Sequence, residues 1–301
     1  MKKLTVFVTG ASGFIGKNFR QYYGTKYKIL APSHKALNLL DSKAVDRFFS
    51  KNQVDIVLHL ANKGGSQRDA DFADSLSSNL RIFFNLVKNQ HRFKKMIYIG
   101  SGAEYAKQYP IVKVKETDFG KQIPQDDFGL YKFIAAKYIN DSKKIVNLRV
   151  FGVYGKYEDW RFKFVSNLIC RALYKKPLIV QNNCVFDYIY INDLLRIIDY
   201  FISHKCKFNS YNIVASSHLE LKSIAQKIAD IADIPVPVIV KNKSLGLEYT
   251  ANNNRLRDEI KGFRWTNIND SLYELFLWYG KNLSKINKKD LSPARKDIWK
   301  K

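Results

Sequence analysis

The 301-residue sequence has few cysteines and no long run of apolar residues. Its three cysteines, Cys170, Cys184 and Cys206, are an odd number and lie too far apart for a CxxC motif, so we expect free thiols and no metal site. No apolar stretch has the length that a membrane-spanning helix needs, and the first residues lead into a strand pattern rather than into the core of a signal peptide. These absences predict a cytoplasmic protein without a membrane span.

Acidic residues are also scarce, because 27 Asp and Glu stand against 51 Lys and Arg and give a formal net charge of +24. Such an excess favours anionic partners. The lysines are scattered through every segment, and the densest run, from Lys281 to Lys301, is a tail without an organised basic stripe and stacking aromatics. We therefore expect a phosphate-rich small molecule as the partner and no nucleic acid.

Strand and helix patterns alternate through the first half of the chain and predict an α/β fold with a doubly wound parallel Rossmann sheet. The predicted strands are Leu4–Val8, Tyr27–Leu30, Asp55–Leu60, Lys95–Gly100 and Ile145–Phe151. The predicted helices are Phe14–Tyr23, Ser42–Lys51, Asp69–Gln90 and about Phe128–Asn140.

The alternation loosens after about residue 152, which indicates a smaller C-terminal α/β substrate lobe. Helices are predicted over Arg161–Tyr174, Asp193–Ser203, Leu221–Ile234 and Ser271–Leu283, and strands over Phe186–Ile191 and Pro235–Val238. We expect residues 1–152 plus about 184–206 to form the Rossmann domain, and about 153–183 plus 207–301 to form the substrate lobe.

A glycine turn, GASGFIG, joins the first predicted strand to the first predicted helix. Gly10 permits a tight turn, Gly13 lets backbone amides approach a pyrophosphate, and Gly16 lets the helix pack close to the strand. The turn is thus predicted to hold the pyrophosphate of NAD or NADP. The residues that it places around the cofactor are Gly10, Ser12, Gly13, Phe14, Ile15 and Gly16.

The GxxGxxG spacing of this turn resembles the extended branch of the short-chain dehydrogenase/reductase superfamily. In that fold an acidic residue at the end of the second strand binds the ribose 2′-hydroxyl of NAD. Here Ser33, His34 and Lys35 occupy that place and no carboxylate does, which favours NADP over NAD. The resemblance also implies that Asp41 binds the adenine edge, and it assigns a turn beneath the cofactor to Leu60, Ala61 and Asn62.

The superfamily's catalytic residues are a Tyr and a Lys four positions apart on one helix, so that both side chains share a face, and a Ser or Thr after the fourth strand. The resemblance assigns Ser101 to the serine, Asn79 to a helix asparagine, and Lys132 to the lysine that also holds the nicotinamide ribose. The tyrosine is replaced by Phe128, which cannot exchange a proton. Two explanations remain open: an engineered Tyr-to-Phe exchange, or a naturally slow or noncatalytic relative.

Further motifs resemble the NAD-dependent epimerase/dehydratase family, which acts on nucleotide-activated sugars. They are Leu148 to Gly155, LRVFGVYG, and Phe186 to Leu194, FDYIYINDL, in which Phe186 replaces the arginine that contacts the diphosphate. Arg161, Lys163 or Arg255 would then have to supply the charge. The residues predicted to bind the substrate are Ser101, Gly102, Ala103, Glu104, Phe151, Gly152, Arg161, Lys163 and Arg255.

The residues after the serine separate the reactions of that family. Gly102 and Ala103 stand where a 4,6-dehydratase has an acid and a base, and Ala103 stands where a 3,5-epimerase/reductase has a cysteine. The sequence therefore favours an NADPH-dependent reductase of a nucleotide-linked 4-keto sugar, made for a surface polysaccharide. A C4- or C2-epimerase with retained NAD and a catalytically silent cofactor-binding protein stay open. Two long helices further imply, by the resemblance, a homodimer.

Overall fold

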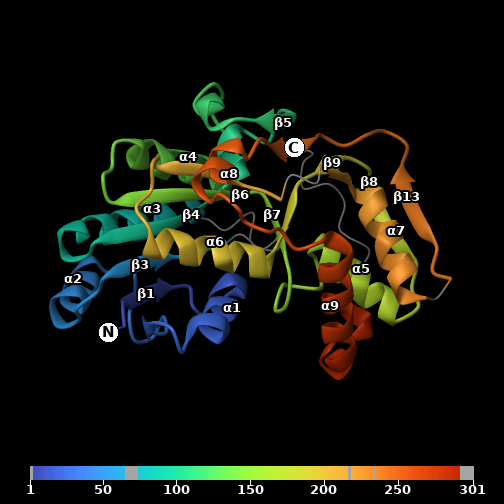
Figure 1. Cartoon of the computed structure of the whole chain (residues 1–301), viewed down its shortest axis with the longest axis horizontal. Coiled ribbons are helices and arrows are strands. Elements are labelled where there is room, and N and C mark those ends of the chain that lie inside the picture. The colour runs from blue at the N-terminus through green and yellow to red at the C-terminus, as the bar shows by residue number, and fades with distance from the viewer. Residues whose placement is uncertain (1–2, 65–73, 216–217, 234, 292–301) are drawn as a thin grey trace.

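The central feature of the computed structural model, which describes residues 3–64, 74–215, 218–233 and 235–291, is a six-stranded parallel sheet (Figure 1). Its strand order is β11-β6-β4-β3-β1-β2. β2 and β3 flank β1 on opposite sides, which makes β1 the kind of switch point where open α/β sheets bind ligands beyond the carboxyl ends of the strands. The strands are β1 (Thr5–Thr9), β2 (Lys28–Leu30), β3 (Ile56–His59), β4 (Lys95–Ser101), β6 (Ile145–Val150) and β11 (Ser210–Ile213).

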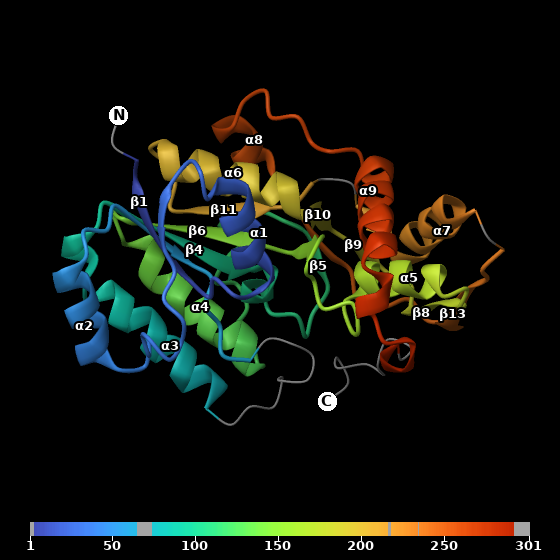
Figure 2. The ribbon, with the colours of Figure 1, turned by 90° about the horizontal axis from the view of Figure 1, so that it is seen from below.

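Helices cover both faces of this sheet, which confirms the predicted doubly wound α/β fold. Figure 2 shows α1 and α6 on one face and α2, α3 and α4 on the other. Their bounds are α1 (Phe14–Tyr23), α2 (Ser42–Lys51), α3 (Ser75–Val87), α4 (Asp127–Asn140) and α6 (Ile191–Ser203). The period-two alternation of the strands supplies the two cores. Val6 and Val8 pack toward α1 and α6, whereas Phe7 packs toward α2 and α3.

A smaller lobe lies beside the sheet, on the right of Figure 1. It holds the parallel pair β8 and β13, together with α5, α7 and α9. A second small sheet, β12-β9-β14-β5, and the pair β7 and β10 complete the described fold. The bounds of these elements are α5 (Phe164–Leu173), α7 (Leu221–Ala232), α8 (Asn254–Glu259), α9 (Ile268–Lys281), β5 (Ile111–Val114), β7 (Gly152–Tyr154), β8 (Leu178–Asn182), β9 (Val185–Phe186), β10 (Tyr188–Tyr190), β12 (Leu219–Glu220), β13 (Val238–Asn242) and β14 (Tyr249–Ala251).

The structure differs from the sequence prediction at several boundaries. The central sheet takes its edge strand, β11, from beyond residue 207, where the second lobe was expected to begin. β13 begins at Val238, after the two prolines, since proline lacks the N–H that a strand ladder needs. The predicted helix Asp69–Gln90 is seen from Ser75, and its first residues lie outside the described ranges.

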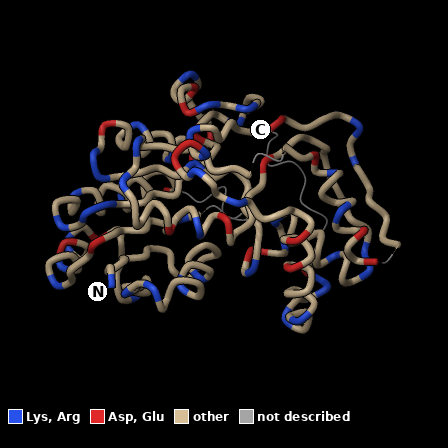
Figure 3. The backbone as a smooth tube through the Cα atoms, in the orientation of Figure 1, with Lys and Arg blue, Asp and Glu red and all other residues tan. Residues whose placement is uncertain are grey.

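Basic residues are spread along both lobes and do not gather on one face of the backbone (Figure 3). The last part of the basic tail, residues 292–301, lies outside the described residues. Among the helices that the structure describes, none is long and apolar enough to cross a membrane.

The smaller lobe contains a buried carboxylate, Glu158, which accepts a hydrogen bond from the Ser166 hydroxyl. Burial raises the pKa of Glu158 to about 7, although the Ser166 hydrogen bond and the charge of Lys163 oppose the shift. A group whose pKa is raised by folding stabilises the folded protein when protonated. This contribution is complete below the ordinary pKa of a glutamate and is lost as the pH rises through about 7.

A Glu158→Gln variant is therefore expected to show a flatter dependence of stability on pH. Its free energy of unfolding, relative to the original chain, should rise by up to about 3 kcal/mol between pH 4.5 and 8. Urea unfolding across that range measures the difference, with the exposed Glu220→Gln as the matched control. A constant difference between the two curves would contradict burial as the cause.

Candidate functional site

The glycine turn closes tightly against the end of β3. Gly10 has a φ of +66°, and a Cβ there would lie 2.7 Å from the Ala61 nitrogen. A Cβ on Gly16 would lie 2.5 Å from the Gly10 oxygen. Helix α1 starts directly after Gly13 with no side chain capping its first amides, and Ser12 and Gly13 are exposed. Open N–H groups at a helix N-terminus suit a phosphate, so the residues present fit a dinucleotide.

Thr9 ties the carboxyl ends of β1 and β3 together. Its hydroxyl oxygen accepts hydrogen bonds from the Leu60 and Ala61 nitrogens, each at 3.1 Å, and bonds to Nδ1 of His59 at 2.8 Å. Burial lowers the pKa of His59 to about 3, and the charge of Lys132 adds to the shift, so the imidazole is neutral. These hydrogen bonds of Thr9 therefore involve no charged group, and they fix the carboxyl ends of β1 and β3 relative to each other.

Asn79, which the sequence assigned to the catalytic group, holds the segment after β3. Its Oδ1 accepts from the Lys63 nitrogen at 2.8 Å, and its Nδ2 donates to the Lys63 oxygen at 2.8 Å. Asn62, in the same segment, accepts a hydrogen bond from the Tyr131 hydroxyl. The segment predicted to lie beneath the cofactor is thus fixed from both α3 and α4.

The loop after β2 exposes Ser33, His34 and Lys35 at the same edge of the sheet. A turn that runs from Ser33 to Leu37 shapes this loop. Asp41, predicted at the adenine edge, caps α2, where its Oδ1 accepts from the Ala44 nitrogen at 3.1 Å. The helix cap accounts for the acidic residue at that position.

Lys132 and Phe128 lie one turn apart on α4. The Lys132 ammonium is buried, donates to the Ile99 oxygen at 2.6 Å and lies 4.5 Å from the ring centre of Tyr98. Burial lowers the pKa of Lys132 to about 8, against the attraction of Glu104. The half-buried ring of Phe128 packs edge-on against Tyr131. α4 thus brings one cation and one aromatic ring to the end of β4.

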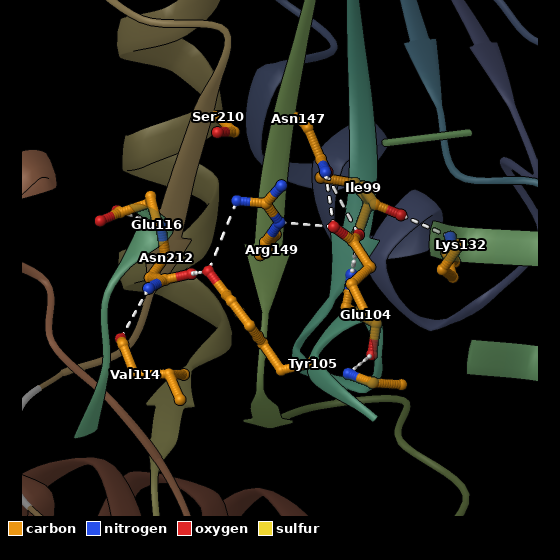
Figure 4. Close-up of polar contacts among 12 residues, drawn as sticks. Ile99, Glu104, Tyr105, Val114, Glu116, Lys132, Asn147, Arg149, Ser210 and Asn212 are labelled. Carbon is orange, nitrogen blue, oxygen red and sulfur yellow. Dashed lines mark hydrogen bonds and ion pairs between the residues drawn. The ribbon is translucent and has the colours of Figure 1, made fainter. Parts of the chain in front are cut away.

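Ser101 ends β4, and a hydrogen bond to the buried Glu104 fixes its backbone. The Ser101 nitrogen donates to Glu104 Oε1 at 3.0 Å, and the Ser101 hydroxyl accepts from the Ala103 nitrogen at 3.1 Å. Figure 4 shows the Glu104 carboxylate bound by Asn147 and Arg149 of β6. Glu104 and Arg149 are both fully buried. This corrects the expectation that Glu104 binds substrate, because its carboxylate lies inside the protein and is already bound.

Aromatic side chains pack closely against Gly102. A Cβ on Gly102 would lie 2.5 Å from the Tyr249 hydroxyl and 2.7 Å from the Phe151 ring. The ring centre of Tyr249 is 4.8 Å from both Phe151 and Phe186. Gly152 allows Phe186 and Tyr188 to approach in the same way. Phe186, in place of the arginine of the resembled family, is thus part of an apolar surface.

Sequence reasoning missed Tyr249. The residue lies in β14, within the part of the chain where the motifs matched only loosely, and no spacing relates it to Ser101. Only the pairing of β14 with β5 and β9 brings it to the site.

The three cations proposed for the diphosphate lie in different places. Lys163 is half-buried and immediately precedes α5. Arg161 forms an ion pair with Asp159 at 2.7 Å. Arg255 donates to the oxygen of Ser210, which begins β11, so its guanidinium lies back from the carboxyl edge. This corrects the expectation for Arg255, which covers the ring of Phe208 instead.

Comparisons with known proteins agree on one family. Residues 6–214, more than half of the chain, match the NAD dependent epimerase/dehydratase family. GDP-L-colitose synthase from Yersinia pseudotuberculosis is 22% identical over 289 residues, which cover 88% of this chain and 93% of that protein. A GDP-6-OMe-4-keto-L-xylo-heptose reductase from Campylobacter jejuni has a TM-score of 0.80 at 16% identity, with 94% and 99% of the two chains covered. A GDP-mannoheptose C4 reductase from the same organism, solved with NADP bound, has a TM-score of 0.79 at 16% identity over 93% and 99%.

Proposed function

Since this chain belongs to the NAD dependent epimerase/dehydratase family and is a nucleotide-sugar oxidoreductase or epimerase, we propose that it is an NADPH-dependent reductase of a nucleotide-linked 4-keto sugar. The observation that carries the choice of cofactor is the loop after β2, which exposes Ser33, His34 and Lys35 and has no carboxylate among them. A lysine and a hydroxyl suit a 2′-phosphate, and the acid that would repel it is absent from that loop.

The proposed substrate is a GDP-linked 4-keto sugar, to be tested first as a 6-deoxyhexose, that is used for a surface polysaccharide. Support for the nucleotide comes from the relatives, whose names state GDP-linked sugars. Lys163 is the predicted cation that we favour for the diphosphate, because its side chain is half-buried and, among the described residues, forms no ion pair, whereas Arg161 is paired with Asp159. The strongly positive chain would attract such an anion.

In a reduction, each of the proposed site residues would have a separate role. When bound, the nicotinamide would supply hydride to the sugar carbonyl carbon. Ser101 would hold the carbonyl oxygen, at a place fixed by Glu104. Lys132 would hold the nicotinamide ribose from α4. Phe128 occupies the position of the family's tyrosine in this proposal and supplies no proton.

A retained-NAD epimerase and a silent cofactor-binding protein are the competing functions, and Phe128 is the feature that favours the silent one. Cofactor content separates these proposals. We expect the purified protein to exchange its cofactor on dialysis and to oxidise NADPH when a GDP-linked 4-keto sugar is added. Stoichiometric NAD that survives dialysis would point to an epimerase, and exchange without any oxidation would point to the silent protein.

A Lys35→Glu variant tests the cofactor preference. The new carboxylate should repel the 2′-phosphate, so we expect the dissociation constant for NADP to rise at least about tenfold while that for NAD changes little. Fluorescence titration measures both constants. Lys28→Glu makes the same charge change at an exposed position at the start of β2 and serves as the control. Equal effects of the two variants would refute the assignment of Lys35.

The resembled family also leads us to propose a homodimer formed through α3 and α4. Light scattering measures the molar mass of the purified protein: the mass of two chains would support the dimer, and the mass of one chain would contradict it.

A further inference from the structure

Tyr249 brings a phenol from β14 to the end of β4. The Ser101 side chain lowers the pKa of its phenol, so the two side chains are neighbours. The Tyr249 hydroxyl is the atom that a Cβ on Gly102 would meet first. The phenol oxygen therefore lies against Gly102, directly after the end of β4 at Ser101.

Strand pairing and hydrogen bonds fix the position of β14, which carries Tyr249. β14 runs between β9 and β5, and the Asp187 nitrogen donates to the Tyr249 oxygen at 3.0 Å. The buried Asp187 carboxylate accepts from the Ala251 nitrogen at 2.9 Å. The Tyr249 ring packs against Phe151 and Phe186, and its hydroxyl lies at Gly102, the residue after Ser101.

Helix α4 approaches the same place. Asp126, which caps α4 two residues before Phe128, acts electrostatically on the Tyr249 phenol. The half-buried ring of Phe128 has no polar atom to offer there. The site thus combines the Ser101 hydroxyl, the Phe128 ring of α4, which has no exchangeable proton, and the Tyr249 phenol of β14.

We propose that Tyr249 is the proton donor of this site and acts on the substrate oxygen that Ser101 holds. The inference rests on the proposed reductase function and deepens it. As the carbonyl carbon gains hydride, the Tyr249 O–H bond breaks and a new O–H bond forms on the sugar oxygen. The phenolate then takes up one proton from the solution, so that the carbonyl compound, NADPH and one proton give the alcohol and NADP⁺.

The electrostatics keep the Tyr249 phenol protonated, although a raised pKa makes it a weaker acid. Burial raises the pKa of the Tyr249 phenol, Ser101 lowers it in part, and Glu104 and Asp126 raise it further. The phenol is consequently protonated at neutral pH, which is the form that a reduction requires.

The test crosses two substitutions, Tyr249→Phe and Phe128→Tyr, with turnover of a GDP-linked 4-keto sugar as the readout. In the original chain, we expect Tyr249→Phe to lower kcat by about 10²-fold, the usual contribution of a general acid. In the Phe128→Tyr background the same change should cost less than about threefold, because a second phenol is then available. A structural role for Tyr249 would cost the same in both backgrounds.

A second readout needs neither turnover nor cofactor. Tyr249→Phe should weaken binding of a GDP-sugar with a C4 oxygen about fivefold and leave binding of the 4-deoxy analogue unchanged, since one hydrogen bond is lost. Calorimetry measures both, with the exposed Tyr273→Phe of α9 as the control. Thermal melting verifies that each variant folds.

Three results would overturn the inference. They are equal losses in the two backgrounds, turnover only after Phe128→Tyr, and equal binding changes for the two sugars. If neither the original chain nor Phe128→Tyr turns over, the proposed reductase fails, and the binding pair still shows whether Tyr249 contacts the C4 oxygen.

Discussion

A Phe128→Tyr variant is expected to reduce the proposed substrate at least about ten times faster than the original chain. The new phenol would lie one helical turn before Lys132, on the same face of α4. A neighbouring ammonium favours the phenolate and so brings the pKa of the phenol closer to neutral pH, where a general acid works best. The buried Tyr249, whose pKa is raised, is the weaker acid of the two. The full general-acid contribution is about 10²–10⁴-fold in rate.

Steady-state kcat with NADPH and a GDP-linked 4-keto sugar measures this gain. Phe276→Tyr adds the same hydroxyl to a half-buried ring on α9 and should change nothing. An unchanged kcat in Phe128→Tyr would mean that residue 128 is not the proton-transfer position.

The second large effect concerns the buried pair beneath Ser101. Arg149→Met is expected to lower the free energy of unfolding by about 3–5 kcal/mol, because it leaves the Glu104 charge buried without its partner. Asn147 would remain as a donor to that carboxylate, but an amide cannot balance its charge. Since Glu104 also accepts from the Ser101 nitrogen, we expect reduced turnover as well.

Urea unfolding compares this variant with Arg161→Met, which breaks a more exposed ion pair with Asp159 and should cost less than about 1 kcal/mol. Glu104→Gln with Arg149→Met should recover part of the stability, because no unpaired charge remains. A loss for Arg149→Met as small as that for Arg161→Met would contradict the structural role of the pair.

The features that sequence could predict are local ones. The turn from Gly10 to Gly16 and the spacing of Phe128 and Lys132 depend on residues a few positions apart, where the geometry of a turn or a helix fixes the outcome. Alternating strands and helices predicted the sheet for the same reason, although β11 joined it from beyond the expected boundary.

The features that sequence could not predict depend on contacts between distant segments. Glu104 reaches Arg149 and Asn147 only because β4 and β6 are neighbours in the sheet. Its carboxylate therefore turned out to be internal, where a position beside Ser101 had suggested a substrate contact. Arg255 was misplaced because its guanidinium lies over Phe208 and beside β11. Tyr249 follows the same rule, since only the packing of β14 brings it to Ser101.

The most direct test of the proposed reduction uses NADPH with deuterium at the hydride-transferring position of the nicotinamide. It measures whether that deuterium appears in the sugar product. Incubation with a GDP-linked 4-keto sugar, followed by mass spectrometry and NMR of the product, locates the deuterium. We expect one deuterium at C4 of the sugar and one NADPH oxidised for each product molecule. A product without deuterium, formed with no net oxidation of NADPH, would contradict the proposed reduction.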